Sequence, residues 1–299
     1  MSTKPTVATI WLQGCSGCHI SLLDLHEGLV DLLGAIDLVA MPLADVKEIP
    51  KVDIGIVEGA VANEENREAL EHLRAQCTTL VALGTCACYG GLPSLRNLHR
   101  VEDVLQCGYV ETSSTVDGAV PVHSDLPHLL PAVKAVQQVV KVDAMIPGCP
   151  PESRSIAEAL KALLAGQTPK RHTHNLCVEC DRHKDALLRP TRDFVTQDVC
   201  APNELEDIDP AKCFLEQGVM CLGPATAAGC GGRCLLGNMP CRGCMGPTPG
   251  ALEQGAKMVS ALSSILPAGG LMFMEDVVGS GYRYCMATSI IPQTLGEEA

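Results

Sequence analysis

A dense run of cysteines constrains this chain more than any other feature. Nine cysteines lie between Cys177 and Cys244, and C-x-x-C pairs stand at both ends of the run. Thiolates at such spacings bind soft metals, and a run this long predicts several iron–sulfur clusters. The same segment is rich in Gly and Pro and has little helical periodicity. Because it has too little apolar surface for a conventional core, we expect bound clusters to hold its loops together.

The composition narrows the function classes. The chain has 299 residues, 46% of them hydrophobic, which is enough for two folded domains. Its net charge of -13 argues against nucleic acid as a partner, because phosphate binding needs a basic face. Charges, Gly or Pro interrupt the apolar stretches before membrane-spanning length, and the first residues carry no export signal. We therefore expect a cytoplasmic protein without a membrane span, whose 17 cysteines stay reduced and bind metal.

The first half of the chain alternates between strand and helix patterns. Short apolar runs predict strands at Thr6–Gln13, Ile36–Leu43, Val52–Val61, Thr78–Leu83 and Val142–Ile146. Amphipathic spacing predicts helices at Ile20–Leu33, Asn63–Gln76 and Glu152–Leu164. Asn63 is the expected N-cap of the second of these helices. Such alternation is typical of an α/β fold with a doubly wound parallel sheet.

Four cysteines follow these predicted strands. Cys15 and Cys18 come after the first strand, and Cys86 and Cys149 each follow a later one. The carboxyl ends of parallel strands open on one common crevice, where ligands bind. We therefore expect these four thiolates to surround a single cluster.

The pattern changes near Pro169, where Cys, Gly and Pro begin to dominate. The sequence predicts an α/β domain at residues 1–168 and a loop-rich iron–sulfur-binding domain at residues 169–299. Within the second domain we expect a helix at Gly250–Leu266, a polar loop at Thr191–Asp209 and an apolar covering segment at Met272–Ile291.

Five motifs together resemble a known family. The upstream motifs are G-C-S-G-C-H at Gly14–His19, G-T-C-A at Gly84–Ala87 and P-G-C-P-P at Pro147–Pro151. The downstream motifs lie at Gly218–Thr226 and Pro240–Cys244. In this order they resemble the small, electron-transfer subunit of nickel–iron hydrogenases, and most closely the cytoplasmic small subunit of the F420-non-reducing (viologen-reducing) type. The resemblance covers nearly the whole chain and implies a flavodoxin-like first domain that holds a cluster and no flavin.

The resemblance implies the ligands of a proximal cluster. By motif, Cys15, Cys18, Cys86 and Cys149 correspond to the ligands of the proximal 4Fe–4S cluster, which receives electrons from the nickel–iron centre. In the family that centre belongs to a separate large subunit. Because this sequence lacks the paired C-x-x-C motifs of that subunit, we expect neither nickel nor a catalytic residue on this chain.

A medial cluster is implied in the second half. Cys230, Cys241 and Cys244 align with the medial ligands, where many members of the family have proline as the fourth residue and hold a 3Fe–4S cluster. Cys234 stands four residues after Cys230 and supplies a fourth thiolate. We therefore expect a 4Fe–4S cluster at Cys230, Cys234, Cys241 and Cys244.

The distal 4Fe–4S cluster is assigned to Cys177, Cys180, Cys213 and Cys221. The commonest family pattern uses a histidine before the first cysteine as an iron ligand, and His174 stands at that spacing before Cys177. The all-thiolate set is the one that the cytoplasmic type implies. A set with His174 in place of Cys180 stays open as the alternative.

Other residues near the motifs have more than one interpretation. His19 either donates a hydrogen bond to cluster sulfur or is an ordinary packed histidine. Glu58 either relays protons at the subunit boundary or caps the next helix. Arg96 and Asn97 are expected to contact the large subunit. Five cysteines outside the motifs are typical of small buried hydrophobic residues: Cys77, Cys88, Cys107, Cys200 and Cys285.

The resemblance implies a subunit of an enzyme that interconverts H2 with protons and electrons. We expect the chain to pass electrons between the active site of the large subunit and an external acceptor through three 4Fe–4S clusters. The implied acceptor system is an iron–sulfur adaptor subunit that feeds a flavin-containing heterodisulfide reductase. Two alternatives remain: the small subunit of an F420-reducing hydrogenase, and a zinc scaffold in which the cysteines only brace loops.

Overall fold

The chain forms two compact units. The structure is a computed structural model that describes residues 4–44, 46, 48–169, 171–182, 208–265 and 276–291. One unit contains the described residues through Pro169 together with residues 286–291, and the other contains those from residue 171 through Cys285. Residues 286–291, which the sequence analysis assigns to the second domain, thus group with the first unit.

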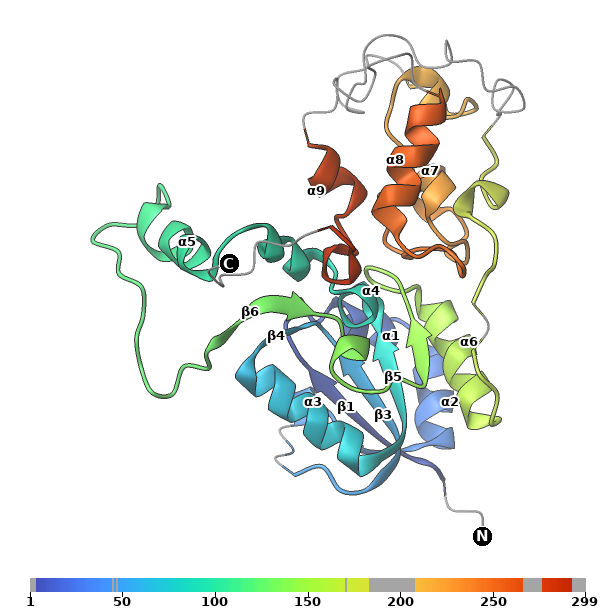
Figure 1. The fold of residues 1–299 in the computed structure, drawn as a ribbon. Coiled ribbons are helices and arrows are strands. Elements are labelled where there is room, and N and C mark those ends of the chain that lie inside the picture. Colours follow the sequence, from blue (N-terminus) through green and yellow to red (C-terminus); the bar gives the residue numbers. More distant parts are fainter. Residues whose placement is uncertain are drawn as a thin grey trace. The chain divides into compact units, whose positions relative to one another are not determined.

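A parallel sheet forms the centre of the first unit (Figure 1). Its strands are β1 (Thr6–Trp11), β2 (Asp37–Ala40), β3 (Val52–Glu58), β5 (Cys77–Leu83) and β7 (Ala144–Ile146). They lie in the order β2-β1-β3-β5-β7, and every neighbouring pair is parallel. This is the flavodoxin-like strand order, so the predicted doubly wound α/β fold is confirmed.

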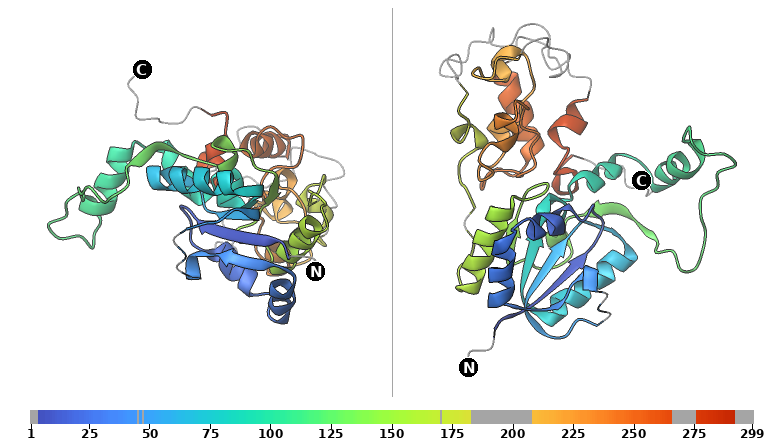
Figure 2. Two further views of the ribbon diagram at one scale, coloured as in Figure 1. Left: turned by 90° about the horizontal axis from the view of Figure 1, so that it is seen from below. Right: turned by 180° about the vertical axis from the view of Figure 1, so that it is seen from behind.

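Helices cover both faces of this sheet (Figure 2). Helix α3 (Glu64–Gln76) covers one face and buries Leu70 and Leu73 completely. Helices α1 (Gly17–Leu23), α2 (Glu27–Ala35) and α6 (Ser153–Leu164) cover the other face. The apolar core on that side joins strand residues to α6. Burial on both faces explains why the strands read as continuous apolar runs in the sequence.

Two predicted elements are interrupted. The predicted helix Ile20–Leu33 is in fact the pair α1 and α2, because the chain turns between them and His26 adopts a φ of 52°. The predicted strand Val52–Val61 ends at Glu58 and resumes as the short strand β4 (Val61–Asn63). By contrast, Asn63 caps α3 as predicted, since its Oδ1 accepts a hydrogen bond from the Asn66 N–H at 2.8 Å.

Gly59 ends β3 and brings it close to the end of β1. Its φ is 93°, and a Cβ at this position would lie 2.7 Å from the carbonyl carbon of Leu12. The Leu12 N–H donates to the Glu58 carbonyl at 2.8 Å. Because glycine alone fits this approach without strain, it fixes Glu58 beside the loop that follows β1.

The rest of the first unit was not predicted. β4 pairs antiparallel with β6 (Leu129–Lys134), and the short helices α4 (Gly84–Tyr89) and α5 (Val101–Gln106) lie between β5 and β6 in the sequence.

Asn97 is fully buried, donates to the Val133 carbonyl at 2.9 Å and accepts from the Val133 N–H at 2.7 Å. The predicted partner contact of Asn97 is therefore wrong, because its amide anchors β6. Arg96 likewise donates to the Leu130 carbonyl at 2.6 Å.

The second unit is rich in loops, as predicted. Its α-helices among the described residues are α7 (Arg233–Leu236), α8 (Gln254–Ile265) and α9 (Val277–Gly281). Helix α8 confirms the predicted helix Gly250–Leu266, although it begins later. Thr191–Asp209 lies outside the described residues except for Ile208 and Asp209, and Met272–Ile291 is described from Asp276 on. No helix in the described ranges has both the length and the apolar character needed to cross a membrane.

Candidate metal centres

Four thiols from distant parts of the chain converge at the carboxyl edge of the sheet. Cys15 and Cys18 follow β1, Cys86 lies in α4 directly after β5, and Cys149 follows β7. Burial and then the charges of Cys149 and Cys15 raise the pKa of Cys86 to about 12. Burial, Glu58 and the thiols of Cys86 and Cys149 raise the pKa of Cys18 as well. The structure thus brings all four of these cysteines to one site.

Two glycines make room for these sulfur atoms. Gly84 has a φ of 83°, and a Cβ there would lie 2.2 Å from Cys18 Sγ. Gly91 has a φ of 55°, and a Cβ there would lie 2.5 Å from Cys86 Sγ. A side chain at either position would displace a sulfur atom, so the glycines preserve the space around the thiols.

Hydrogen bonds tie the cysteine-bearing loops to one another. The Thr85 N–H donates to the Gly148 carbonyl at 2.8 Å, and the Gly148 N–H donates to Thr85 Oγ1 at 3.0 Å. Ser21 Oγ donates to the Pro151 carbonyl at 2.5 Å. The segments that carry Cys18, Cys86 and Cys149 are therefore held in place by the polypeptide itself.

Glu58 organises the turn that carries Cys15 and Cys18. Its carboxylate is 3% exposed and accepts the Cys18 N–H at 3.1 Å and the His19 N–H at 3.0 Å. Burial raises the pKa of Glu58, but the hydrogen bonds from His19 and Cys18 outweigh it and hold the pKa below its usual value. Since Asn63 caps α3, Glu58 does not cap the next helix. Instead it binds the first turn of α1 across the sheet.

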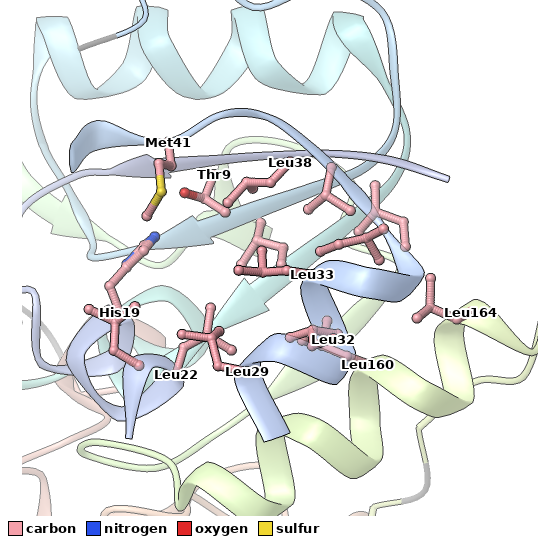
Figure 3. A pocket seen from close by; sticks show the side chains of 15 residues that line it. Thr9, His19, Leu22, Leu29, Leu32, Leu33, Leu38, Met41, Leu160 and Leu164 are labelled. Carbon is pink, nitrogen blue, oxygen red and sulfur yellow. The ribbon is translucent and has the colours of Figure 1, made fainter. Parts of the chain in front are cut away.

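The contacts of the His19 ring favour a packed histidine over a hydrogen-bond donor to cluster sulfur. Its Nδ1 is hydrogen-bonded to Glu58, and its Nε2 is buried without a partner among the described residues. Figure 3 shows the ring beside Met41 and Thr9 in an apolar pocket between the sheet and the helices of one face. Trp11 meets the ring edge-on at 5.5 Å between centroids. These contacts fit a packed histidine that supports Glu58.

Four cysteines of the second unit line one pocket: Cys177, Cys180, Cys213 and Cys221. A Cβ at Gly223 would lie 3.3 Å from Cys177 Sγ and 3.6 Å from Cys221 Sγ. Burial is the largest cause that raises the pKa of Cys221 to about 11, and the charges of Cys213 and Cys180 also raise it. His174 is exposed and is not among the described residues that line the pocket.

The four remaining cysteines of the motifs form two pairs. Burial and then the charges of Glu179 and Cys234 raise the pKa of Cys230. Burial and then the charges of Cys221 and Cys244 raise the pKa of Cys241. The Cys241 N–H donates to Cys221 Sγ at 3.3 Å. The second pair therefore lies directly beside the pocket lined by Cys221.

The cysteines outside the motifs differ in exposure. Cys77, Cys88 and Cys285 are buried, as predicted for small hydrophobic residues, and Cys88 Sγ donates to the Ala82 carbonyl at 3.4 Å. The prediction for Cys107 is wrong, because Cys107 is exposed. Cys200 lies outside the described residues.

No three His, Cys, Asp or Glu side chains of the described ranges converge as one metal ion requires, with sulfur about 2.3 Å from a zinc ion. The ligands of a four-iron cluster stand further apart than those of one ion. At the edge of the sheet, Gly84 and Gly91 keep open the space around the thiols that a four-iron cluster would need.

Comparison with known proteins gives consistent results. The family model described as NADH ubiquinone oxidoreductase, 20 Kd subunit, matches residues 15–163. The chain is 38% identical to a subunit of the F420-non-reducing hydrogenase of Methanothermobacter thermautotrophicus, over 100% of this chain and 99% of that protein. It is 42% identical to a vhu subunit of the F420-non-reducing hydrogenase of Methanocaldococcus jannaschii, over 86% of this chain and 87% of that protein.

A solved structure of NAD+-reducing NiFe-hydrogenase in the H2-reduced state contains a similar chain. The identity is 39% and the TM-score 0.54, over 56% of this chain and 94% of that chain. The matches to the F420-non-reducing hydrogenase subunits extend over both units, and the fold agrees with that of the solved chain. This chain therefore belongs to the family of nickel–iron hydrogenase small subunits, of the F420-non-reducing type.

Proposed function

We propose that this chain is the electron-transfer subunit of a nickel–iron hydrogenase and holds three 4Fe–4S clusters. Iron–sulfur clusters supply reversible one-electron oxidation and reduction, which would connect the nickel–iron centre of the large subunit with an external acceptor. The observation that carries the proposal is the convergence of four thiols, Cys15, Cys18, Cys86 and Cys149, at one edge of the sheet in a chain of this family.

The proximal cluster is assigned to that convergent set. Gly84 and Gly91 keep space open around the sulfur atoms, and Glu58 holds the turn of Cys15 and Cys18. These residues would position the cysteine-bearing loops around the cluster. No residue of this set needs to exchange a proton with a substrate.

The distal cluster is assigned to Cys177, Cys180, Cys213 and Cys221. The shared pocket favours Cys180 over the exposed His174 as the fourth ligand. The medial cluster is assigned to Cys230, Cys234, Cys241 and Cys244. The contact between Cys241 and Cys221 supports a short path between the medial and distal clusters.

The partners follow from the family. The relatives matched over the whole chain are subunits of F420-non-reducing hydrogenases, which favours this type over the F420-reducing alternative. We propose a cytoplasmic complex with the large subunit, in which an iron–sulfur adaptor subunit carries electrons to a flavin-containing heterodisulfide reductase. Reduction of F420 by H2 in the purified complex, without a further flavoprotein, would contradict this subtype.

Metal analysis of the anaerobically purified complex tests the cluster assignment. We expect about twelve iron atoms and equal acid-labile sulfide in this subunit, as three four-iron clusters require. Cys86→Ser should lose about four of the irons as one cluster. Cys107→Ser, which changes an exposed cysteine outside all three sets, should lose none. A colourless protein that contains zinc and no iron would refute the proposal.

A further inference from the structure

One charged side chain lines the distal pocket together with its four cysteines. Arg182 is 6% exposed and lines the same pocket as Cys177, Cys180, Cys213 and Cys221. Among the described residues that line it, Arg182 is the only one with a cationic or anionic side chain. The guanidinium of Arg182 therefore places a positive charge at this site.

The guanidinium is held rigidly. Its Nη1 donates to the carbonyls of Asp209 and Lys212 at 2.9 and 2.8 Å, and its Nη2 donates to Asn238 Oδ1. The group also lies over the Phe214 ring, 3.8 Å from its centroid. These contacts connect the segment after Cys180 with the segment before Cys213, so Arg182 orients both cysteine-bearing segments.

One donor of Arg182 remains unused. Its Nε is buried and has no hydrogen-bond acceptor among the described residues. Buried donors without an acceptor are rare in folded proteins, and the pocket that Arg182 shares with the four cysteines offers a place for one. Thiolate or sulfide sulfur of a cluster in this pocket would be an acceptor of that kind.

We propose that Arg182 is a positioning residue that raises the reduction potential of the distal cluster. The inference rests on the proposed function, because it requires a cluster on these four cysteines. On reduction the cluster takes up one electron and becomes more negative, and a fixed cation in a poorly hydrated site favours that state. Arg182 itself gains or loses neither a proton nor an electron.

An EPR-monitored redox titration of the anaerobic complex measures this effect, with mediators supplying the electron. The signal that Cys213→Ser abolishes identifies the distal cluster. At a fixed applied potential, we expect Arg182→Gln to raise the ratio of oxidised to reduced distal cluster at least tenfold, a shift of about 59 mV for one electron. Arg182→Lys keeps the charge but loses the Nε–H, so it should shift the ratio less and in the same direction.

Lys212→Gln is the matched control. It removes a positive charge next to Cys213, but Lys212 is exposed and its charge is screened by solvent, so the potential should stay at the wild-type value. A distal signal at the wild-type potential in both Arg182 variants would overturn the inference. If the Arg182→Gln variant does not bind the distal cluster, the potential measured in the Arg182→Lys variant decides the inference. A wild-type complex that lacks the distal signal would instead contradict the proposed function.

Discussion

The two units use cysteine in different ways. In the first unit the thiols stand at the edge of a complete sheet, and Cys18 is the one member of its set that belongs to the fully buried apolar core. In the second unit Cys213, Cys221 and Cys241 are themselves core residues, packed with Phe214 and leucines. The difference predicts that the proposed clusters are added to a finished fold in the first unit and are part of the fold in the second.

The secondary structure supports this contrast. Five parallel strands and the helices on both faces satisfy the backbone of the first unit without metal. In the second unit α8 is the longest described helix, and Cys213, Cys221 and Cys241 are part of the apolar core. Without iron these thiols stay protonated and no longer link the loops, so binding of the clusters and folding should be coupled there.

Removal of iron should therefore have the largest effect and separate the two units. After anaerobic chelation, we expect residues 208–246 to lose most of their protection from hydrogen exchange. Amides of β3 and β5 should keep theirs, because the sheet does not depend on metal. Mass-spectrometric exchange of the loaded and chelated protein checks this. Equal loss of protection in both units, or no loss in either, would contradict the proposed difference between them.

Single cysteine substitutions should also distinguish the two units. Cys221→Ser should remove the distal cluster and also place a hydroxyl in the core of the second unit, which we expect to cost about 1–3 kcal/mol beyond the lost metal. Cys86→Ser should remove the proximal cluster and leave the first unit folded. Thermal unfolding together with iron content distinguishes the two. A sheet that unfolds in Cys86→Ser would show that the first unit also depends on its cluster.

Glu58→Gln tests how far the polypeptide holds the proximal turn. A hydrogen bond to a charged acceptor contributes about 1.5–3 kcal/mol to stability. We therefore expect Glu58→Gln to lower the free energy of unfolding of the first unit by about 2 kcal/mol. The pKa of Glu58 in the folded protein lies below its usual value. The Glu58 carboxylate therefore stabilises the fold at pH values above the usual pKa, and this stabilisation is lost as the pH falls through the folded pKa. Unfolding of the iron-free protein by urea between pH 3 and pH 7 should show this slope in wild type and not in the variant. Parallel pH profiles would contradict the role of Glu58.

The smallest expected effect is that of Cys234→Pro. Loss of one thiolate should convert the medial cluster to the three-iron form, with about one iron atom fewer and a changed potential. The fold should persist, because Cys234 is exposed and contributes little to the core. Iron content and the EPR spectrum of oxidised protein report the conversion. An unchanged four-iron signal would remove Cys234 from the ligand set.

The sequence predicts the parts of this molecule that depend on local pattern. Alternating apolar runs predict the sheet, and the position of Cys15, Cys86 and Cys149 after strands predicts where they meet. The turn at His26 escapes prediction because the apolar spacing continues through it, and a positive φ at a non-glycine residue has no sequence signal.

Long-range contacts of polar side chains are equally hidden. Glu58 binds the first turn of α1, and Arg182 binds the Asp209 carbonyl and Asn238 from a distant segment. No periodicity links these positions, so their roles appear only when the fold brings them together. The V-E-G sequence at Val57–Gly59 was the one available signal for Glu58, since glycine after a strand often marks a close approach of backbone.

Anomalous X-ray scattering from crystals of the anaerobic complex, measured across the iron edge, tests the central claim most directly. We predict three separate groups of iron in this subunit, each bound by four cysteines. One group should lie at Cys15, Cys18, Cys86 and Cys149, and two should lie side by side in the second unit where Cys221 meets Cys241. Single zinc ions at these thiols, or no iron at the edge of the sheet, would contradict the account.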